Sequence, residues 1–378
     1  MKRLTAYALF LALLLTGCGG SADPDTAQES IQVIAMDTAM LITTYGERSP
    51  AAAYAAEDVI RDLEAKLSRT MEDSDVSRLN SAGGQPIAIS QDAFTLLRQA
   101  ERCRIQTSGA FDPTIAPVAA AWGFAGGEEY RVPSQEELAA LLPLVDCSAV
   151  FTDSQLPEGE EYNTAGQYEG EIRYTAALAP GQAVDLGGIA KGYAADILVR
   201  VFQEYGVPRG LAQLGGNVLA WGDRPGGTPW RVGVQDPAKP GDKNAFAGVL
   251  ELTDSFAVTS GGYQRYFEQD GKRYHHIIDP ATGYPADSGL TSVTVVADAF
   301  KTSQPCMGAL CDAYSTALFV MGEEKALDFW RGCRDMEAGE PLFQLVLVTE
   351  DGRVVVTEGL ADCFTLDEAS GYAYETVS

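Results

Sequence analysis

The histidines are the side chains of this sequence with the most obvious catalytic potential. Only two occur in 378 residues, and they are adjacent, as His275 and His276. A turn-like segment, Asp279-Pro280-Ala281-Thr282-Gly283, follows within a few residues. A carboxylate near an imidazole can orient the ring and raise its basicity, which predicts a general base. Two ordinary polar side chains without a catalytic role explain the same residues equally well.

A glycine-rich junction around Asp185 is a second candidate. The apolar stretch before Asp185 predicts a buried strand, and Gly187-Gly188 lead into a predicted helix that contains Lys191. Two glycines let the backbone approach a ligand, and the N–H groups of a helix N-terminus favour an anion. The residue order excludes a P-loop and a G-x-G-x-x-G fingerprint. A strand-to-helix turn without a ligand is an equal alternative.

Asp312 and Thr316 form a third candidate because their spacing puts them on one face of a helix, which we expect to begin at Asp312. A carboxylate and a hydroxyl on one face suit a hard cation such as Mg²⁺. An N-cap aspartate followed by a mid-helix threonine is the simpler interpretation of this segment alone.

Aromatic residues accompany a fourth segment, Ser108–Thr114, which contains Phe111 and is followed by Trp122. Both rings could pack on a flat ring system. Aromatic side chains are more often part of a core, and this segment taken alone favours the core.

Several helices must position these residues. Apolar periodicity and capping signals predict helices over residues 51–70, 90–106, 189–205, 312–321 and 323–330, with another after a capping box at Ser134.

The second half of the chain is rich in predicted strands, over residues 230–234, 248–252 and 292–296. Asp270-Gly271 and Asp351-Gly352 are hairpin turn signals. The βαβ alternation of a doubly wound sheet is missing, so the predicted fold class is α+β with antiparallel sheet. Residues 158–168 are polar and predict a surface insertion.

The N-terminus has the features of an export signal. Lys2 and Arg3 precede an apolar run that is too short to span a bilayer comfortably. Leu15-Thr16-Gly17-Cys18 resembles the lipobox of bacterial lipoproteins, in which the cysteine carries the lipid; a chance cysteine after an ordinary signal is the alternative. We predict a signal peptide over residues 1–17, lipidated Cys18 with a flexible tether over 18–30, and one domain over 31–378. The predicted location is the outer face of the cytoplasmic membrane.

The net charge of −26 argues against nucleic acid as a partner. An anion site in such a chain must use backbone N–H groups, a few cations and a metal. Besides Cys18, cysteines occur at positions 103, 147, 306, 311, 333 and 363, an even number that permits disulfides in an exported chain. Two structural bridges are the simplest interpretation, and free or redox-active thiols are the alternative.

In this order, the motifs resemble the ApbE family, the FAD:protein FMN transferases. The similarity runs from about Met36 to Leu360. The blocks that carry it are Met36–Met40, Asp73–Asn80, Gly109–Pro113, Asp185–Tyr193, Gly215–Asn217, Val258–Gly261, His276–Pro285 and Asp312–Ala317. The blocks at 185–193 and 276–285 are the most specific.

The resemblance implies two lobes of largely antiparallel sheet with flanking helices, and a cleft for FAD between them. By motif position, the residues that line the FAD site are Met40, Thr70, Ala110, Phe111, Asp112, Asp185, Lys191 and Ile277. Mg²⁺ would be held by the backbone carbonyl of Gly188 with Asp312 and Thr316, and Ser315 lies close enough to contribute. His276 matches the family's catalytic histidine, and we expect Asp279 to orient it.

The activity that the resemblance implies is Mg²⁺-dependent cleavage of FAD. FMN would be attached through a phosphoester to a Ser or Thr in the flavinylation motif of an exported or membrane flavoprotein, and AMP would be released. Mg²⁺ would neutralise phosphate charge, and positioning would supply much of the rest. Two alternatives remain: an FAD pyrophosphatase that uses water, and a flavin-binding lipoprotein without catalysis. Relative to the family pattern, residues 300–310 are interpreted as an insertion beside the metal site, which a disulfide through Cys306 or Cys311 could pin.

Overall fold

The computed structural model describes residues 27–125, 129–156, 172–300, 304, 306–335 and 339–378. The predicted signal peptide, Cys18 and most of the tether lie outside these residues, as does the predicted insertion at 158–168. In the described part of the chain, no helix is long and apolar enough to cross a membrane. Strand β1 (Gln28–Ala35) already begins inside the stretch predicted as tether, so the folded domain starts by Gln28.

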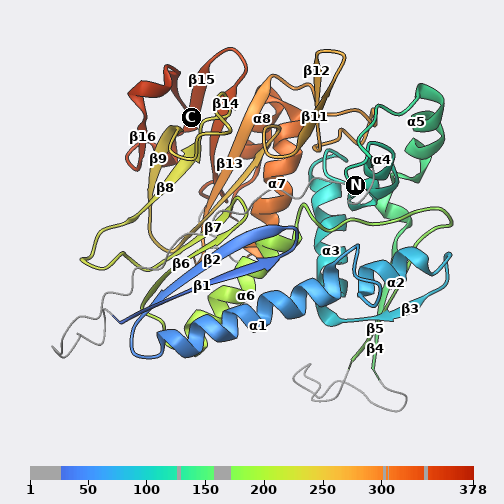
Figure 1. Ribbon diagram of the computed structural model, residues 1–378, viewed down its shortest axis with the longest axis horizontal. Coiled ribbons are helices and arrows are strands. Elements are labelled where there is room, and N and C mark those ends of the chain that lie inside the picture. The colour runs from blue at the N-terminus through green and yellow to red at the C-terminus, as the bar shows by residue number, and fades with distance from the viewer. Residues whose placement is uncertain (1–26, 126–128, 157–171, 301–303, 305, 336–338) are drawn as a thin grey trace, which may run out of the picture.

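A nine-stranded sheet forms the middle of the molecule (Figure 1). Its strands, in spatial order, are β1, β2 (Thr38–Tyr45), β6 (Arg209–Leu214), β7 (Asn217–Trp221), β10 (Ser255–Gly261), β13 (Leu290–Asp298), β14 (Gln344–Thr349), β15 (Arg353–Thr357) and β17 (Ala373–Val377). Every neighbouring pair is antiparallel except β15 with β17. The predicted α+β class with largely antiparallel sheet is confirmed.

Three smaller sheets accompany the large one. Their strands are β16 (Phe364–Leu366), β9 (Phe246–Leu252) and β8 (Trp230–Gln235); β3 (Ile87–Ile89), β5 (Arg173–Ala177) and β4 (Phe151–Gln155); and β11 (Tyr266–Gln269) with β12 (Lys272–His275). Both predicted hairpin turns are confirmed, since Asp270-Gly271 joins β11 to β12 and Asp351-Gly352 joins β14 to β15. Asp270 and Gly271 both have positive φ, 54° and 74°, as a tight two-residue hairpin turn requires.

Helices cover one face of the large sheet, and the β8–β9–β16 sheet covers the other. The helical layer is α1 (Ser49–Leu67), α6 (Ala190–Glu204), α7 (Met307–Met321) and α8 (Glu323–Gly332), and alternate strand residues such as Val258 and Val295 pack against it. The intervening residues, such as Ala257 and Val296, pack with Trp230 and Leu250 of the small sheet. Because successive side chains of a strand point to opposite faces of the sheet, these strands contribute to two separate cores.

The remaining helices lie beside this layered body. They are α2 (Asp75–Ser81), α3 (Gln91–Gln106), α4 (Ala116–Ala121) and α5 (Gln135–Leu141), with short 3₁₀ turns at Pro113–Ile115, Leu142–Leu144, Cys147–Ala149, Glu358–Leu360 and Glu368–Ser370. The predicted starts of α3 and α5 are confirmed, because Ser90 accepts from the N–H of Ala93 and Ser134 from that of Glu137. Helix α1 ends at Leu67, before the predicted end at residue 70, because Ser68 has extended backbone.

Helix α7 begins at Met307, so the prediction that Asp312 opens it is wrong. The start is capped from another helix: the Asp196 carboxylate of α6 accepts the N–H groups of Gly308 (2.7 Å) and Ala309 (2.9 Å). Asp312 therefore lies inside the helix. The last residues of the predicted insertion, from Met307 to Leu310, form the first turn of α7 and are buried.

The six cysteines of the described residues are free thiols, so the predicted disulfides are wrong. Cys103 on α3 and Cys311 on α7 are fully buried among apolar side chains, and burial raises the pKa of the Cys103 thiol to about 12. Here the thiols act as small apolar core residues.

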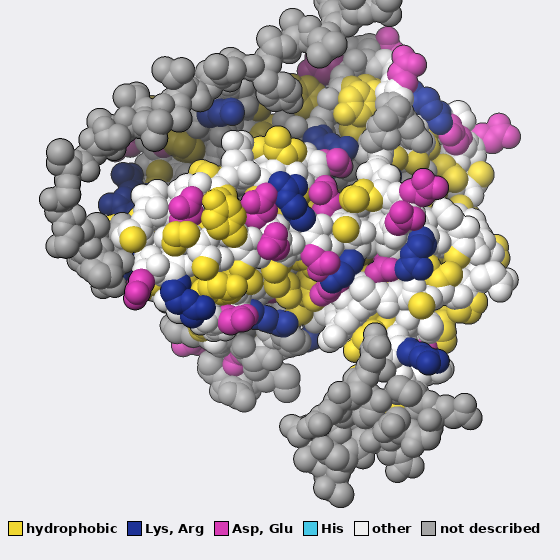
Figure 2. Space-filling view, turned by 60° about the horizontal axis from the view of Figure 1, so that its bottom comes forward, with side chains coloured by type: hydrophobic (Ala, Val, Ile, Leu, Met, Phe, Trp, Pro, Cys, Tyr) yellow, Lys and Arg dark blue, Asp and Glu magenta, His cyan; other side chains and the backbone are white. Residues whose placement is uncertain are grey.

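Charged side chains of both signs are interspersed on the face shown in Figure 2. Part of this pattern comes from α1, where Arg61 pairs with Glu57 and Lys66 with Asp62. No histidine is visible among the described residues of this face. On this face, acidic and basic side chains are therefore mixed, and no single-sign patch dominates.

Candidate active site

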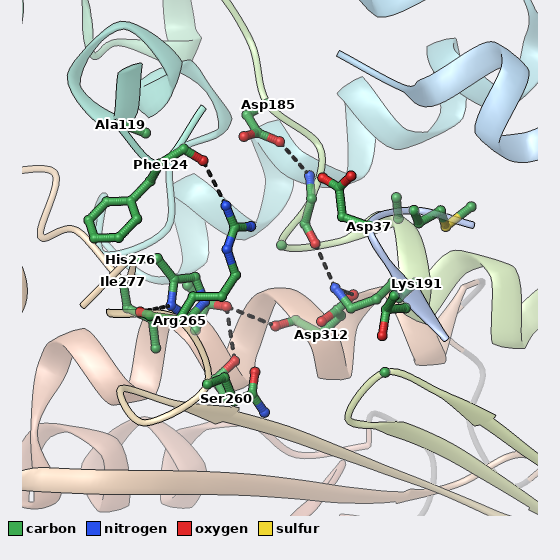
Figure 3. A pocket seen from close by; sticks show the side chains of 18 of the residues that line it. Asp37, Ala119, Phe124, Asp185, Lys191, Ser260, Arg265, His276, Ile277 and Asp312 are labelled. Carbon is green, nitrogen blue, oxygen red and sulfur yellow. Dashed lines mark hydrogen bonds and ion pairs between the residues drawn. The ribbon is translucent and has the colours of Figure 1, made fainter. Parts of the chain in front are cut away.

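A cavity of about 680 Å³ brings together residues far apart in the chain (Figure 3). Its wall includes Asp185 and Gly188 from the junction before α6, and Lys191 from the first turn of that helix. It also includes His276 and Ile277 after β12, and Asp312 and Thr316 of α7. The volume lies within the range of pockets that hold cofactor-sized ligands. The candidate segments identified in the sequence therefore surround one space.

The glycine-rich junction presents a cation beside a helix N-terminus. The Asp185 carboxylate accepts the N–H of Gly187 (2.8 Å) and pairs with Arg69 (3.3 Å), which fixes the turn. The Lys191 ammonium donates to the Gly187 carbonyl (2.8 Å) and lies 3.8 Å from the Asp312 carboxylate. This end of the cavity is suited to an anion.

Oxygen donors gather where α7 meets this junction. Asp312 is buried and accepts the N–H of Gly192 at 2.9 Å. Thr316 lies one turn further along α7, and a Cβ on Gly188 would be 3.7 Å from its hydroxyl. Among the described residues, no group of three His, Cys, Asp or Glu side chains could hold a metal. One carboxylate with neutral oxygens fits Mg²⁺, which in proteins often takes its remaining ligands from substrate phosphates and water.

Ser315, predicted as a further metal ligand, lies behind this donor set. It is fully buried and is absent from the cavity wall. Its hydroxyl contacts the Ser260 hydroxyl (2.8 Å) and the Asp312 carbonyl (2.8 Å). In this geometry Ser315 supports the helix and does not face the cavity.

His276 faces the cavity with one ring nitrogen held by the backbone. Nδ1 lies 3.1 Å from the carbonyl oxygen of Arg265, and a carbonyl can only accept, so Nδ1 carries the proton and Nε2 is left with its lone pair. Burial and the adjacent Arg265 guanidinium lower the pKa of His276 from the ordinary 6.5 to about 3. The ring is therefore neutral near pH 7 and able to accept a proton.

Asp279 does not contact the His276 ring in this structure, contrary to the sequence prediction. Its carboxylate accepts the N–H of Ala281 (2.9 Å) and the Thr282 hydroxyl (3.1 Å), and so closes its own turn. The turn is anchored by the Trp122 indole, which donates to the carbonyl of Gly283 (2.8 Å). Asp279 and the buried Trp122 thus shape the loop that follows His276.

His275 has a different environment. Nε2 lies 3.0 Å from the Ala286 carbonyl, Nδ1 accepts the N–H of Ile277, and the ring packs edge-on against Phe319. Both nitrogens are engaged with the protein. Of the two adjacent histidines, His276 is the one that lines the cavity.

Comparisons with known proteins show the family to which this chain belongs. The model of the ApbE family matches residues 36–339, which is most of the chain. This chain belongs to the ApbE family.

Curated relatives of this ApbE chain share one name, FAD:protein FMN transferase. That of Treponema pallidum is 31% identical over 91% of this chain and 90% of its own length, and that of Haemophilus influenzae is 32% identical over 87% and 90%. Among solved structures, the ApbE protein of Thermotoga maritima superposes with a TM-score of 0.72 at 30% identity, covering 88% of this chain and 98% of its own. The flavin transferase ApbE of Vibrio cholerae has a TM-score of 0.68 at 25% identity over 90% and 96%. The chain is accordingly an enzyme of the transferase class.

The ApbE cavity includes most residues that the family resemblance places at FAD. Thr70 is exposed at its edge, and Ala110, Phe111 and Ile277 present apolar surface to it. Met40 is absent from the wall, because β2 points its side chain into the core beneath the cavity.

Asp112 reaches the wall, but its carboxylate is fully engaged within the protein. Oδ1 accepts the N–H and hydroxyl of Thr114, and Oδ2 accepts the N–H of Cys147 and pairs with Arg104, each at 3.1 Å. This side chain fixes the local backbone and leaves little capacity for a ligand.

Asp37, Arg265 and Asn217 line the cavity but were not assigned to the site from the sequence. Asp37 lies in the β1–β2 turn, within the Met36–Met40 block that resembles the family, whereas Arg265, before β11, lies in none of the resembling blocks. The Gly215-Gly216-Asn217 block did carry a signal, since a paired glycine turn next to a polar residue allows close approach of a ligand.

Proposed function

We propose that this chain is a Mg²⁺-dependent FAD:protein FMN transferase. It cleaves the diphosphate of FAD, attaches FMN through a phosphoester to a Ser or Thr hydroxyl of another protein, and releases AMP. The observation that carries the proposal is that Lys191, His276 and Asp312, from distant segments of the chain, line the same cavity. They bring a cation, an imidazole and a carboxylate to one space.

The chain's own groups have distinct tasks in this reaction. Lys191 and the N-terminus of α6 bind the diphosphate electrostatically. The Nε2 lone pair of His276 accepts the proton of the acceptor hydroxyl, whose own pKa lies far above 7. Mg²⁺, held by Asp312, Thr316 and the Gly188 carbonyl, supplies charge neutralisation on the phosphate oxygens when bound.

The Arg265 guanidinium adds a cation next to His276 (Figure 3). It donates to the Phe124 carbonyl at 2.9 Å and pairs with no carboxylate among the described residues. We propose that Arg265 stabilises the negative charge that develops on the transferred phosphoryl group, because a cation stabilises such charge most strongly in a partly desolvated site.

The proposal extends to location and partner. Export with a lipid on Cys18 would place the enzyme on the outer face of the cytoplasmic membrane. Its acceptor would then be an exported or membrane flavoprotein with a Ser/Thr flavinylation motif. The lipobox-like sequence supports the first point, and the family name of the relatives supports a protein acceptor.

The decisive experiment incubates the purified chain with FAD and Mg²⁺, with and without an acceptor domain, and follows acceptor mass and AMP. Acceptor that gains one FMN together with stoichiometric AMP supports transfer. Rapid AMP release that is indifferent to acceptor identifies a pyrophosphatase instead. Tight FAD binding without AMP in either arm identifies a flavin-binding protein.

A further inference from the structure

Asn217 has a buried amide nitrogen without a hydrogen-bond partner. The residue is 1% exposed, and its Nδ2 has no partner within the described residues. A buried donor left unpaired costs free energy, so such groups in a native fold call for an explanation. The neighbouring strand positions, Leu214 and Val258, carry apolar side chains that avoid this cost.

Strand pairing places Asn217 at the cavity. It is the first residue of β7, directly after the Gly215-Gly216 turn, and lies opposite Val258 of β10. Ser260 lies two positions further along β10 and on the same face, where its hydroxyl is 3.2 Å from that of Thr316. Asn217, Ser260 and Thr316 all line the cavity, at the end that holds the oxygen donors for Mg²⁺.

The nearby hydroxyls are already paired with one another. Ser260 contacts both Ser315 and Thr316, and Ser315 also donates to the Asp312 carbonyl. The carboxamide torsion of an asparagine is broad, so a small rotation turns Nδ2 toward a ligand. A neutral donor suits a phosphate oxygen in a chain as acidic as this one, because it adds no counter-charge that neighbouring carboxylates would neutralise.

We infer that Asn217 is a substrate-binding residue whose Nδ2 donates a hydrogen bond to a phosphate oxygen of the bound dinucleotide, at the metal end of the cavity. This inference rests on the proposed function. The bond forms only in the complex, so the free protein carries the cost of the unpaired donor and the complex recovers it.

Asn80 provides a matched contrast, because both polar atoms of its carboxamide have hydrogen-bond partners. Nδ2 donates to the Val184 carbonyl (2.9 Å), and Oδ1 accepts the Val184 N–H (2.8 Å). Replacing Asn80 strips two backbone groups of partners, whereas replacing Asn217 removes a donor that has none. In the free protein, replacing Asn80 should therefore lower the stability, whereas replacing Asn217 should leave it unchanged or raise it.

The test compares Asn217→Leu, Asn217→Asp and Asn80→Leu with the wild type. Three quantities are measured: the melting temperature without ligand, the Kd for FAD with Mg²⁺, and kcat/KM for transfer. We expect Asn217→Leu to melt at or above the wild-type temperature while FAD affinity and kcat/KM fall about 10- to 100-fold. Asn217→Asp, which keeps the shape but opposes phosphate charge, should bind FAD more weakly still. Asn80→Leu should melt lower.

Two results would overturn the inference alone: Asn217→Leu melting as low as Asn80→Leu, or both Asn217 variants binding and transferring like an active wild type. A wild-type protein that neither binds FAD nor transfers FMN would instead overturn the proposed function, and the inference with it. The two failures are therefore distinguished by the wild-type arm.

Discussion

Gly192 of α6 and Gly308 of α7 bring these two helices into backbone contact. A Cβ on Gly192 would lie 2.1 Å from the Gly308 carbonyl oxygen, and a Cβ on Gly308 would lie 2.4 Å from that of Gly192. The crossing lies next to Lys191 on one helix and one turn before Asp312 on the other. Because neither glycine has a side chain, the two helices come close enough to hold the Lys191 ammonium near the Asp312 carboxylate.

Gly192→Ala should destabilise the protein, because the added methyl group has backbone atoms in its way. Overpacking of this kind costs about 1–3 kcal/mol, and we expect at least that from urea unfolding. Transfer should fall as well, since Lys191 and Asp312 separate. Gly332→Ala is the matched control: its Cβ meets nothing within 4 Å at the end of α8, so stability should stay or rise slightly. Equal stability of the two variants would contradict the tight crossing.

His276→Ala should lower the transfer rate about 10²- to 10⁴-fold while FAD affinity changes little, because the imidazole acts on the acceptor proton. Acceptor mass and FAD fluorescence measure the two effects. His275→Ala is the neighbouring control. It removes the bond to Ala286 and should mainly lower the free energy of unfolding, by about 1–3 kcal/mol. Wild-type transfer by His276→Ala would exclude this residue from proton transfer.

The pH profile should report the lowered pKa of His276. Neutral imidazole is the active form, so kcat/KM rises as pH increases through the free-enzyme pKa, and that rise should lie well below pH 6.5. Bound phosphate favours the protonated ring, so the corresponding rise in kcat should lie at higher pH. Arg265→Gln removes a cation that lowers the pKa and should shift the kcat/KM rise upward. An unshifted profile in Arg265→Gln would argue against this electrostatic coupling.

Removal of divalent metal should abolish transfer, and added Mg²⁺ should restore it. Asp312→Asn keeps the side-chain volume but removes the one carboxylate among the proposed ligands, so we expect at least a 100-fold loss of transfer at ordinary Mg²⁺. Raising the Mg²⁺ concentration should recover part of that loss. Full activity in chelator, or an Asp312→Asn variant with normal Mg²⁺ dependence, would be incompatible with the assigned donor set.

Local signals in the sequence predicted much of the fold. Ser90 and Ser134 cap their helices as expected, and the two Asp-Gly turns join strands, because each depends on residues within a few positions. The start of α7 could not be found in this way. Its cap is Asp196, more than a hundred residues earlier, and its first turn is apolar on all sides because it is buried.

The candidate site was predictable where a motif contains the functional atom itself, as for Lys191, His276 and Asp312. It was not predictable where contacts between distant segments determine the partner of a side chain. Asp279 is the carboxylate nearest to His276 in sequence, yet the ring is held by the Arg265 carbonyl. The even number of cysteines indicated bridges, but all six thiols of the described residues are free, and four of them are buried.

The carbonyl behind His276 also limits how a proton can travel. A peptide oxygen cannot take up a proton near neutral pH, so the far side of the ring is closed to relay. Any proton that arrives at Nε2 must depart from the same atom, toward the leaving group or water. Turnover would then require the leaving group or water to take this proton from Nε2, which links regeneration of the base to product departure.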